Sequence, residues 1–166
     1  MVEIQTSRFG ALSFQDTDII TFAEGPLGFE SHLRFSIVDP GDQTQILWLQ
    51  SLTDGSIAFP ILEPKIFEPN FTLCLTPKDM SFIEVNHVNE CNVFSILTIP
   101  ADITKMNANL KAPIVINPTK KIAKQIVMQD SKLPLDMEIY KILKSYIIKT
   151  NQEKNQIKNT DTSIEA

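Results

Sequence analysis

Apolar residues occur in short runs separated by turn residues along most of the chain, from Phe9 to Met128. A new run begins about every ten residues, and Gly, Pro, Asp and Asn are common between the runs. Short strands at this spacing are typical of an antiparallel all-β sandwich or barrel. The runs are FGALSF, IITF, LRFSIV, ILWLQS, IAFPIL, FTLCL, NVFSILTI, PIVI and IAKQIVM.

Several of these runs are apolar on both faces of the strand that they would form. In NVFSILTI, Val93 and Leu97 alternate with Phe94 and Ile96. A strand with one face in water would carry a polar residue at every second position. We therefore predict a mainly β fold, a compact antiparallel β-barrel-like domain with further elements packed outside it. The side chains expected to be buried are Trp48, Phe94, Ile96, Leu97, Val115 and Ile116.

Three segments carry local signals for turns and a helix. In Gly25-Pro26-Leu27-Gly28, proline at the second position and glycine at the fourth predict a type I turn. Asn117-Pro118-Thr119 is expected to close a hairpin between the runs PIVI and KQIVM. A short helix is expected to begin near Pro77, because proline is tolerated in a first helical turn.

After Leu133 the pattern becomes that of an amphipathic helix. Apolar residues recur at helical spacing, and we predict a domain over residues 1–134, a C-terminal helix over 135–150 and a disordered polar tail over 151–166. An isolated helix of this length is marginal in water, so its apolar stripe must dock on the barrel, on a second copy through self-association, or on a partner. The sequence leaves these three alternatives open. The stripe consists of Leu135, Ile139, Ile142, Leu143, Tyr146 and Ile147.

The net charge of −5 is unevenly distributed along the 166 residues. Residues 1–104 hold 4 basic and 14 acidic side chains, a net charge of −10, whereas residues 105–131 have a net charge of +4. An acidic surface attracts basic proteins and repels nucleic-acid phosphates, although acidity for solubility alone is an open alternative. The start MVEIQTS lacks the apolar region of a signal peptide, and no run approaches the length of a membrane span. We expect a cytoplasmic protein with no membrane or direct nucleic-acid contact.

The residue types that carry catalysis are sparse. His32 and His87 have no second histidine at metal-ligand spacing and are expected in exposed loops. Cys74 and Cys91 are expected to be small packing residues, because no lysine or histidine is adjacent in sequence to lower a thiol pKa. There is no glycine-rich phosphate-binding motif. We predict no enzyme activity, no cofactor and no metal site.

Four motifs together resemble the flagellar assembly factor family FliW. They are GPLGFE at 25–30, ILWLQSL at 46–52, VFSILTIP at 93–100 and NANLKAPIVIN at 107–117, in the same order as in the family, and the resemblance covers residues 3–134. It implies a non-catalytic cytoplasmic β-barrel protein. It also implies two partners, flagellin and CsrA, an RNA-binding translational repressor that cannot silence flagellin mRNA while FliW holds it.

The family-like motifs supply the candidate partner-binding residues. Asparagine amides beside a sheet edge offer donors and acceptors to a second protein, and a proline limits further strand pairing there. The alternative is that Asn107 and Asn109 only bond a local turn. A structural or small-ligand-binding barrel is the second functional hypothesis. The candidate residues are Glu24, Phe29, Glu30, Asn107, Asn109, Leu110, Lys111 and Pro113.

Overall fold

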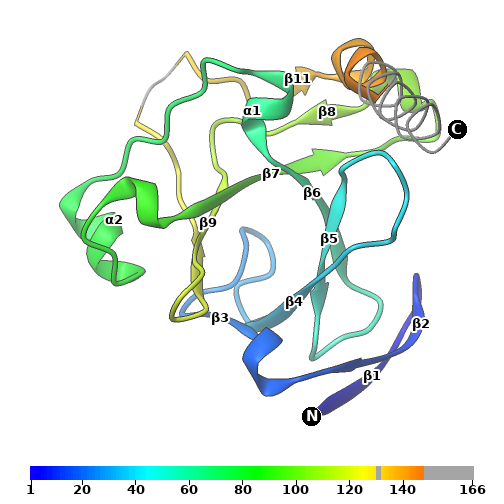
Figure 1. Cartoon of the computed structure of the whole chain (residues 1–166), viewed down its shortest axis with the longest axis vertical. Coiled ribbons are helices and arrows are strands. Elements are labelled where there is room, and N and C mark those ends of the chain that lie inside the picture. The colour runs from blue at the N-terminus through cyan, green and yellow to red at the C-terminus, as the bar shows by residue number, and fades with distance from the viewer. Residues whose placement is uncertain (130–131, 148–166) are drawn as a thin grey trace, which may run out of the picture.

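A closed seven-stranded β-barrel forms the centre of the protein (Figure 1). The computed structural model describes residues 1–129 and 132–147. Around the barrel the order is β3-β4-β5-β6-β7-β9-β10, and the ring closes where β10 pairs with β3. The predicted barrel is therefore confirmed. Its strands are β3 (Ile20–Phe22), β4 (Arg34–Val38), β5 (Leu47–Ser51), β6 (Ala58–Leu62), β7 (Asn92–Thr98), β9 (Ile114–Asn117) and β10 (Ile122–Gln125).

One pairing in this ring differs from the predicted antiparallel arrangement. Strands β10 and β3 run parallel, with Ile122 beside Thr21 and Ala123 beside Phe22, and the other pairings are antiparallel. Seven strands cannot alternate in direction all the way around a closed ring, because an odd number leaves two neighbours pointing the same way. The hairpin predicted at 117–119 is confirmed, since β9 and β10 pair across it.

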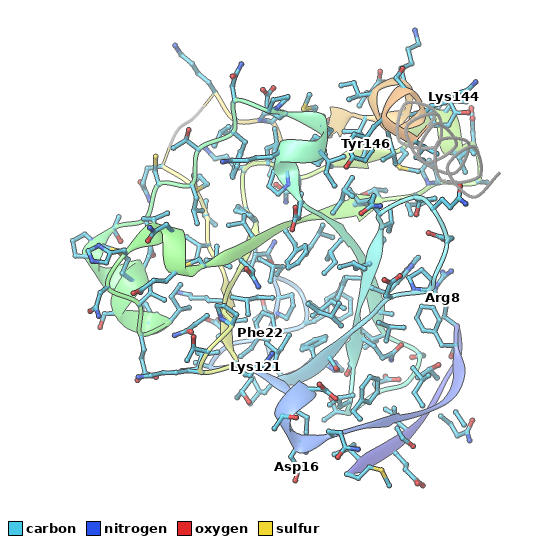
Figure 2. All side chains as sticks on the ribbon, viewed as in Figure 1. Arg8, Asp16, Phe22, Lys121, Lys144 and Tyr146 are labelled. Carbon is cyan, nitrogen blue, oxygen red and sulfur yellow. The ribbon has the colours of Figure 1, made fainter. Side chains whose placement is uncertain are left out.

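The two apolar faces of the central strands cover two different cores. Phe94 and Ile96 of β7 face the barrel interior, whereas Val93 and Leu97 pack in an outer cluster beneath α1 (Pro64–Phe67) and the C-terminal helix. Phe22, labelled in Figure 2, belongs to the interior. Its ring meets that of Phe35 edge to face, with the centroids 5.1 Å apart. The interior cluster is Ile20, Phe22, Phe35, Leu49, Ile61, Phe94, Ile114, Ile116 and Ala123.

A third cluster fills the space between the β9–β10 hairpin and α2 (Pro77–Phe82). Helix α2 begins where the sequence predicted, because the Thr76 hydroxyl accepts a hydrogen bond from the Asp79 N–H (3.1 Å) and the Asp79 carboxylate accepts one from the Thr76 N–H (3.0 Å). This reciprocal capping box satisfies two backbone donors that the first turn would otherwise leave unpaired. The cluster consists of Ile83, Val85, Val115 and Ile126.

The residues predicted to be buried are confirmed except for Trp48 and Ile96, which are half-buried. Trp48 lies beneath the turn between β1 (Val2–Thr6) and β2 (Gly10–Phe14), a separate two-stranded sheet. The Arg8 guanidinium lies 3.9 Å above the Trp48 ring, and the Phe9 ring meets its edge. A hairpin turn covers less of an indole ring than a packed sheet would, which leaves Trp48 partly exposed.

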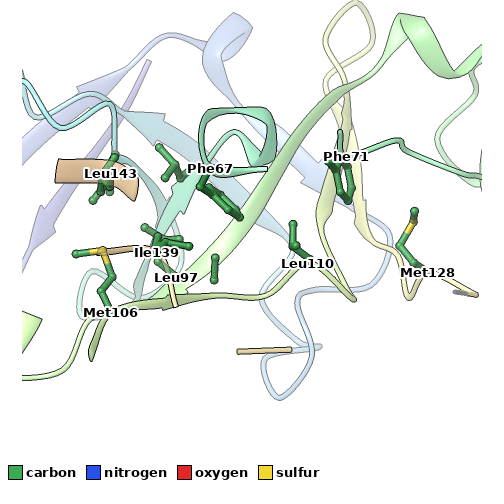
Figure 3. Packing of buried hydrophobic residues seen from close by; sticks show 11 residues of the cluster. Phe67, Phe71, Leu97, Met106, Leu110, Met128, Ile139 and Leu143 are labelled. Carbon is green, nitrogen blue, oxygen red and sulfur yellow. The ribbon is translucent and has the colours of Figure 1, made fainter. Parts of the chain in front are cut away.

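The C-terminal helix docks on its own barrel (Figure 3). Helical residues begin at 140 rather than at the predicted 135, because β11 (Met137–Glu138) first pairs with β8 (Asn107–Ala108). Ile139 and Leu143 are buried in the outer cluster, whereas Leu135, Ile142 and Tyr146 of the predicted stripe are exposed. The predicted helix end and the tail over 151–166 lie outside the described residues. The outer cluster is Ile46, Leu62, Phe67, Phe71, Leu97, Met106, Ala108, Leu110, Met128, Ile139 and Leu143.

Three 3₁₀ turns complete the described elements, at Asp16–Asp18, Val88–Glu90 and Ile103–Lys105. None of the helices in the described part of the chain has the length and apolar character that crossing a bilayer requires.

Candidate partner-binding surface

The β3–β4 loop, residues 23–33, carries the first family-like motif as a tightly folded projection. The Gly25 N–H donates to the Glu30 carbonyl (3.0 Å), and the Phe29 N–H donates to the Pro26 carbonyl (2.7 Å). Gly28 has a φ of +87° at the third position of this 26–29 turn, as a type II turn requires. The predicted type I turn over 25–28 is therefore wrong, because the turn covers residues 26–29 and is of type II. The prediction placed Gly28 at the fourth position, whereas its positive φ is the one required at the third.

Gly25 is required by the close return of the loop on itself. A Cβ atom at this position would lie 2.2 Å from the Phe29 carbonyl oxygen and 2.3 Å from that of His32, far inside van der Waals contact. Both obstacles are backbone atoms, so they cannot rotate away as a side chain could. The loop therefore has a fixed shape, and it is a preformed surface feature rather than a loose connection.

The outer side of the β3–β4 loop combines apolar and acidic side chains. Leu27 is 59% exposed and Phe29 is 36% exposed, with the Phe29 ring resting edge-on against Phe59 at 5.0 Å between centroids. Glu24 and Glu30 are exposed beside them. The Gly28 N–H donates to the Glu30 carboxylate (3.0 Å). This bond, together with a second from the backbone N–H of Glu30 itself, lowers the pKa of the Glu30 carboxylate. Glu30 therefore stays charged at neutral pH.

The NANLKAP segment, residues 107–113, belongs to the fourth family-like motif, and it is more buried than predicted. Leu110 is only 2% exposed and Pro113 is fully buried, so neither offers appreciable side-chain surface to a partner. The Asn109 side-chain oxygen accepts a hydrogen bond from the Ala112 N–H (3.0 Å), which is the local-turn alternative for this residue. Replacing Asn109 therefore changes stability as well as surface, and it is unsuited to a test of binding alone. Asn107 and Lys111 are half-buried.

Gln125 joins the two motifs, which sequence reasoning missed. Its side-chain oxygen accepts a hydrogen bond from the Leu27 N–H (2.8 Å), and its side-chain nitrogen donates to the Ala112 carbonyl (2.9 Å). One amide thus fixes the β3–β4 loop to the NANLKAP segment, although they are far apart in sequence. The sequence could not have pointed to this role, because a single Gln within a strand belongs to no recognisable motif or spacing.

A groove of about 660 Å³ lies on the other side of the NANLKAP segment. Its wall includes Leu110, Phe71 and Met128, which Figure 3 labels, together with Leu75, Leu133, Pro134 and Met137. The N–H groups of Leu110 and Lys111 both donate to the Pro134 carbonyl, at 3.0 and 3.2 Å. The segment is therefore held between the loop on one side and the chain leading to the C-terminal helix on the other.

The histidines and cysteines form no cluster in the described part of the chain, where no three His, Cys, Asp or Glu side chains lie close enough to hold a metal ion. His87 is exposed, as predicted, whereas His32 is half-buried with Nδ1 3.4 Å from the Thr53 hydroxyl. Cys91 packs against the α2 cluster as predicted, and burial raises the pKa of its thiol. Cys74 is exposed, so the prediction of a packing role is wrong for it: alternation along residues 71–76 turns it outward with Thr72 and Thr76.

Comparison with known proteins gives the family. The family model described as "FliW protein" matches residues 3–139. This chain belongs to the FliW family. It is 39% identical over 162 residues to "Flagellar assembly factor FliW" of Bdellovibrio bacteriovorus, covering 98% of this chain and 91% of that protein. The protein of the same name from Caldanaerobacter subterraneus subsp. tengcongensis is 35% identical, with 87% of this chain and 97% of the relative covered.

A solved structure agrees with this assignment. The crystal structure of the flagellar assembly factor FliW superposes with a TM-score of 0.77 at 25% identity, covering 83% of this chain and 96% of that one. The barrel described above is therefore a FliW fold. The family model ends at residue 139, so the helix that begins at 140 follows directly after the matched region.

Proposed function

We propose that this FliW-family chain is a non-catalytic, cytoplasmic regulator that binds flagellin and the translational repressor CsrA. While it holds CsrA, the repressor cannot silence flagellin mRNA. Newly made flagellin captures the regulator and releases CsrA, so flagellin synthesis adjusts to its own product. The resemblance of the sequence to the family supplies both partners.

The observation that carries this proposal is the rigid, exposed β3–β4 loop. Its apolar tip, Leu27 and Phe29, lies beside two carboxylates, and its shape is fixed by Gly25 and by the Gln125 bridge. A surface that is ordered before binding loses less conformational entropy on association. Its negative charge suits a partner that binds RNA and therefore presents basic side chains. The proposed contact residues are Glu24, Phe29, Glu30, Asn107, Asn109 and Lys111.

The small-ligand barrel is less well supported. A ligand-binding barrel needs an interior space lined by convergent polar groups. Here the interior positions of the strands are occupied by the interior cluster, in which Phe22, Phe35 and Leu49 are completely buried. The groove beside the NANLKAP segment lies outside the barrel wall, where a protein partner has access.

The test measures binding of the full-length protein to purified flagellin and to purified CsrA by biolayer interferometry. An RNA-release assay accompanies it, in which CsrA is bound to a flagellin leader RNA. We expect both proteins to bind, and we expect added protein to displace the RNA. Failure of both partners to bind contradicts the proposal.

A charge variant localises the contact. Glu24→Lys places a positive charge at the loop and is expected to weaken CsrA binding at least tenfold. Glu3→Lys makes the same charge change on β1, which is a separate sheet, and serves as the matched control. Equal effects of the two substitutions would show that net charge, and not the loop, controls binding.

A further inference from the structure

Residues 71–76, between α1 and α2, form neither helix nor strand and pair with no strand in the described chain (Figure 1). Burial alternates along them: Phe71, Leu73 and Leu75 point inward, and the residues between them are exposed. The backbone N–H and C=O groups of residues 72–75 form no hydrogen bond with the described residues. Such a row of unpaired groups is a template for pairing with another chain.

A second open edge lies across from this segment, at the beginning of β7. On one side, Asn92, Val93 and Phe94 pair with β9. On the other side, β6 pairs only with Ser95 and Ile96, because the chain leaves the sheet at Pro64 to enter α1. The β6–β7 register would place Pro64 opposite Val93, and proline has no N–H to give to a strand ladder. The start of β7 is therefore unpaired on this edge among the described residues. Since successive residues of a strand point their backbone groups to opposite sides, Val93 is the one that presents its N–H and C=O there.

A groove of about 620 Å³, here called the strand groove, separates these two open edges. Its walls are Phe71, Thr72 and Leu73 on one side and Cys91, Asn92 and Val93 on the other. This volume falls within the range of about 300–1,000 Å³ usual for binding sites. The floor is partly apolar, and the charges of Glu63 and Lys65 at the rim cancel.

We propose that the strand groove binds an extended segment of flagellin by β-strand addition. The incoming backbone would satisfy the free groups of residues 72–75, of the first residues of β7, or of both, and alternate side chains would enter the groove. This inference rests on the proposed function. Flagellin is the assigned occupant because the groove is electrically neutral, whereas an RNA-binding repressor with a basic surface is better matched by the acidic loop.

Hydrogen exchange tests the proposal directly. Amide exchange is followed by mass spectrometry on the full-length protein alone, with purified flagellin, and with purified CsrA. Unpaired amides at 72–75 exchange fast in the free protein, and we expect flagellin to slow exchange within residues 71–76 or 91–94 at least tenfold. Binding of flagellin without slower exchange at either edge overturns the strand groove but leaves the proposed function intact. Failure of flagellin to bind at all contradicts both, and slowing by CsrA alone shows that the assigned occupant is wrong.

A steric variant gives an independent measurement. Asn89 is exposed and lines the strand groove, so Asn89→Trp fills it and is expected to weaken flagellin binding at least tenfold. Asn86 is also exposed and lies in the same connection but outside the groove lining, so Asn86→Trp is the matched control, with an expected change of less than twofold. Both variants should keep the wild-type thermal midpoint. Equal flagellin affinity of the two variants overturns the proposal.

Discussion

Replacing Leu143 with alanine should destabilise the protein by about 2–3 kcal/mol, since core Leu→Ala changes cost about 2–5 kcal/mol. Leu143 is 4% exposed and packs in the outer cluster with Ile139 and Met106. We expect the lower part of that range because a helix at the edge of the fold can shift to fill part of the space. For a chain of this size, the change corresponds to a fall in thermal midpoint of about 5–10 °C.

The measurement is urea unfolding followed by circular dichroism, with the thermal midpoint as a second readout. Ile142→Ala is the matched control, because Ile142 is the preceding helix residue and is 39% exposed. Its expected cost is below about 1 kcal/mol, since surface substitutions have small effects and alanine is the better helix former. A lower urea midpoint with an unchanged slope indicates a loss of stability rather than a change of unfolded state. If both variants unfold at the same urea concentration, the helix does not dock through Leu143 and the packing argument is wrong.

Four further outcomes are expected. Gly25→Ala should destabilise the β3–β4 loop, because the added Cβ would lie 2.2 Å from the Phe29 carbonyl oxygen. The expected sign is faster amide exchange in the loop. An unchanged exchange rate would contradict the close approach of Gly25 to that oxygen. Asn109→Ala should lower the free energy of unfolding, measured by thermal unfolding, by about 1–2 kcal/mol, because the hydrogen bond to the Ala112 N–H is lost. An unchanged stability would show that this bond does not stabilise the turn. Glu90 accepts hydrogen bonds from the Asn86 and His87 N–H groups, which lower its pKa below the ordinary 4.5. Its contribution to stability is therefore present above pH 4.5 and is lost as the pH falls through the lowered pKa. Glu90→Gln should reduce this acid sensitivity in a series of unfolding midpoints measured at different pH values. The on-rate for CsrA should slow as salt rises, and a salt-independent on-rate measured by surface plasmon resonance would remove the electrostatic argument.

Much of the fold could be predicted because burial on two faces leaves a direct trace in the sequence. The double alternation around Phe94 and Leu97 predicted a strand covered on both sides, and the structure places these residues in the interior cluster and the outer cluster. Pro77 predicted the start of α2, because proline is tolerated in a first helical turn, and the structure adds Thr76 as the capping residue. The boundary of the C-terminal helix was predicted less well. Helical spacing starts at Leu135, but pairing of β11 with β8 keeps residues 137–138 extended.

The candidate site was only partly predictable, because a motif in sequence does not tell which of its side chains face inward. Leu110 and Pro113 belong to the NANLKAP segment, yet both are buried beneath neighbouring chain. Gln125 belongs to no motif, yet its side chain holds the two motifs together through hydrogen bonds to Leu27, 98 positions away, and to Ala112, 13 positions away. Side-chain contacts over such distances depend on how the barrel closes, and no local pattern encodes them.

By itself, the sequence determined the family, the barrel, the β9–β10 hairpin and the start of α2, since periodicity and proline act through interactions between residues close together in the chain. The tertiary structure alone decided the parallel β10–β3 pairing, the bridge by Gln125 and the two open edges of the strand groove. The physical reason is the same in each case. These features join groups that are far apart in the chain and meet only when the seven-stranded ring closes. Most are backbone groups, which are identical at nearly every position of the sequence, and Gln125 reaches two of them with its side chain.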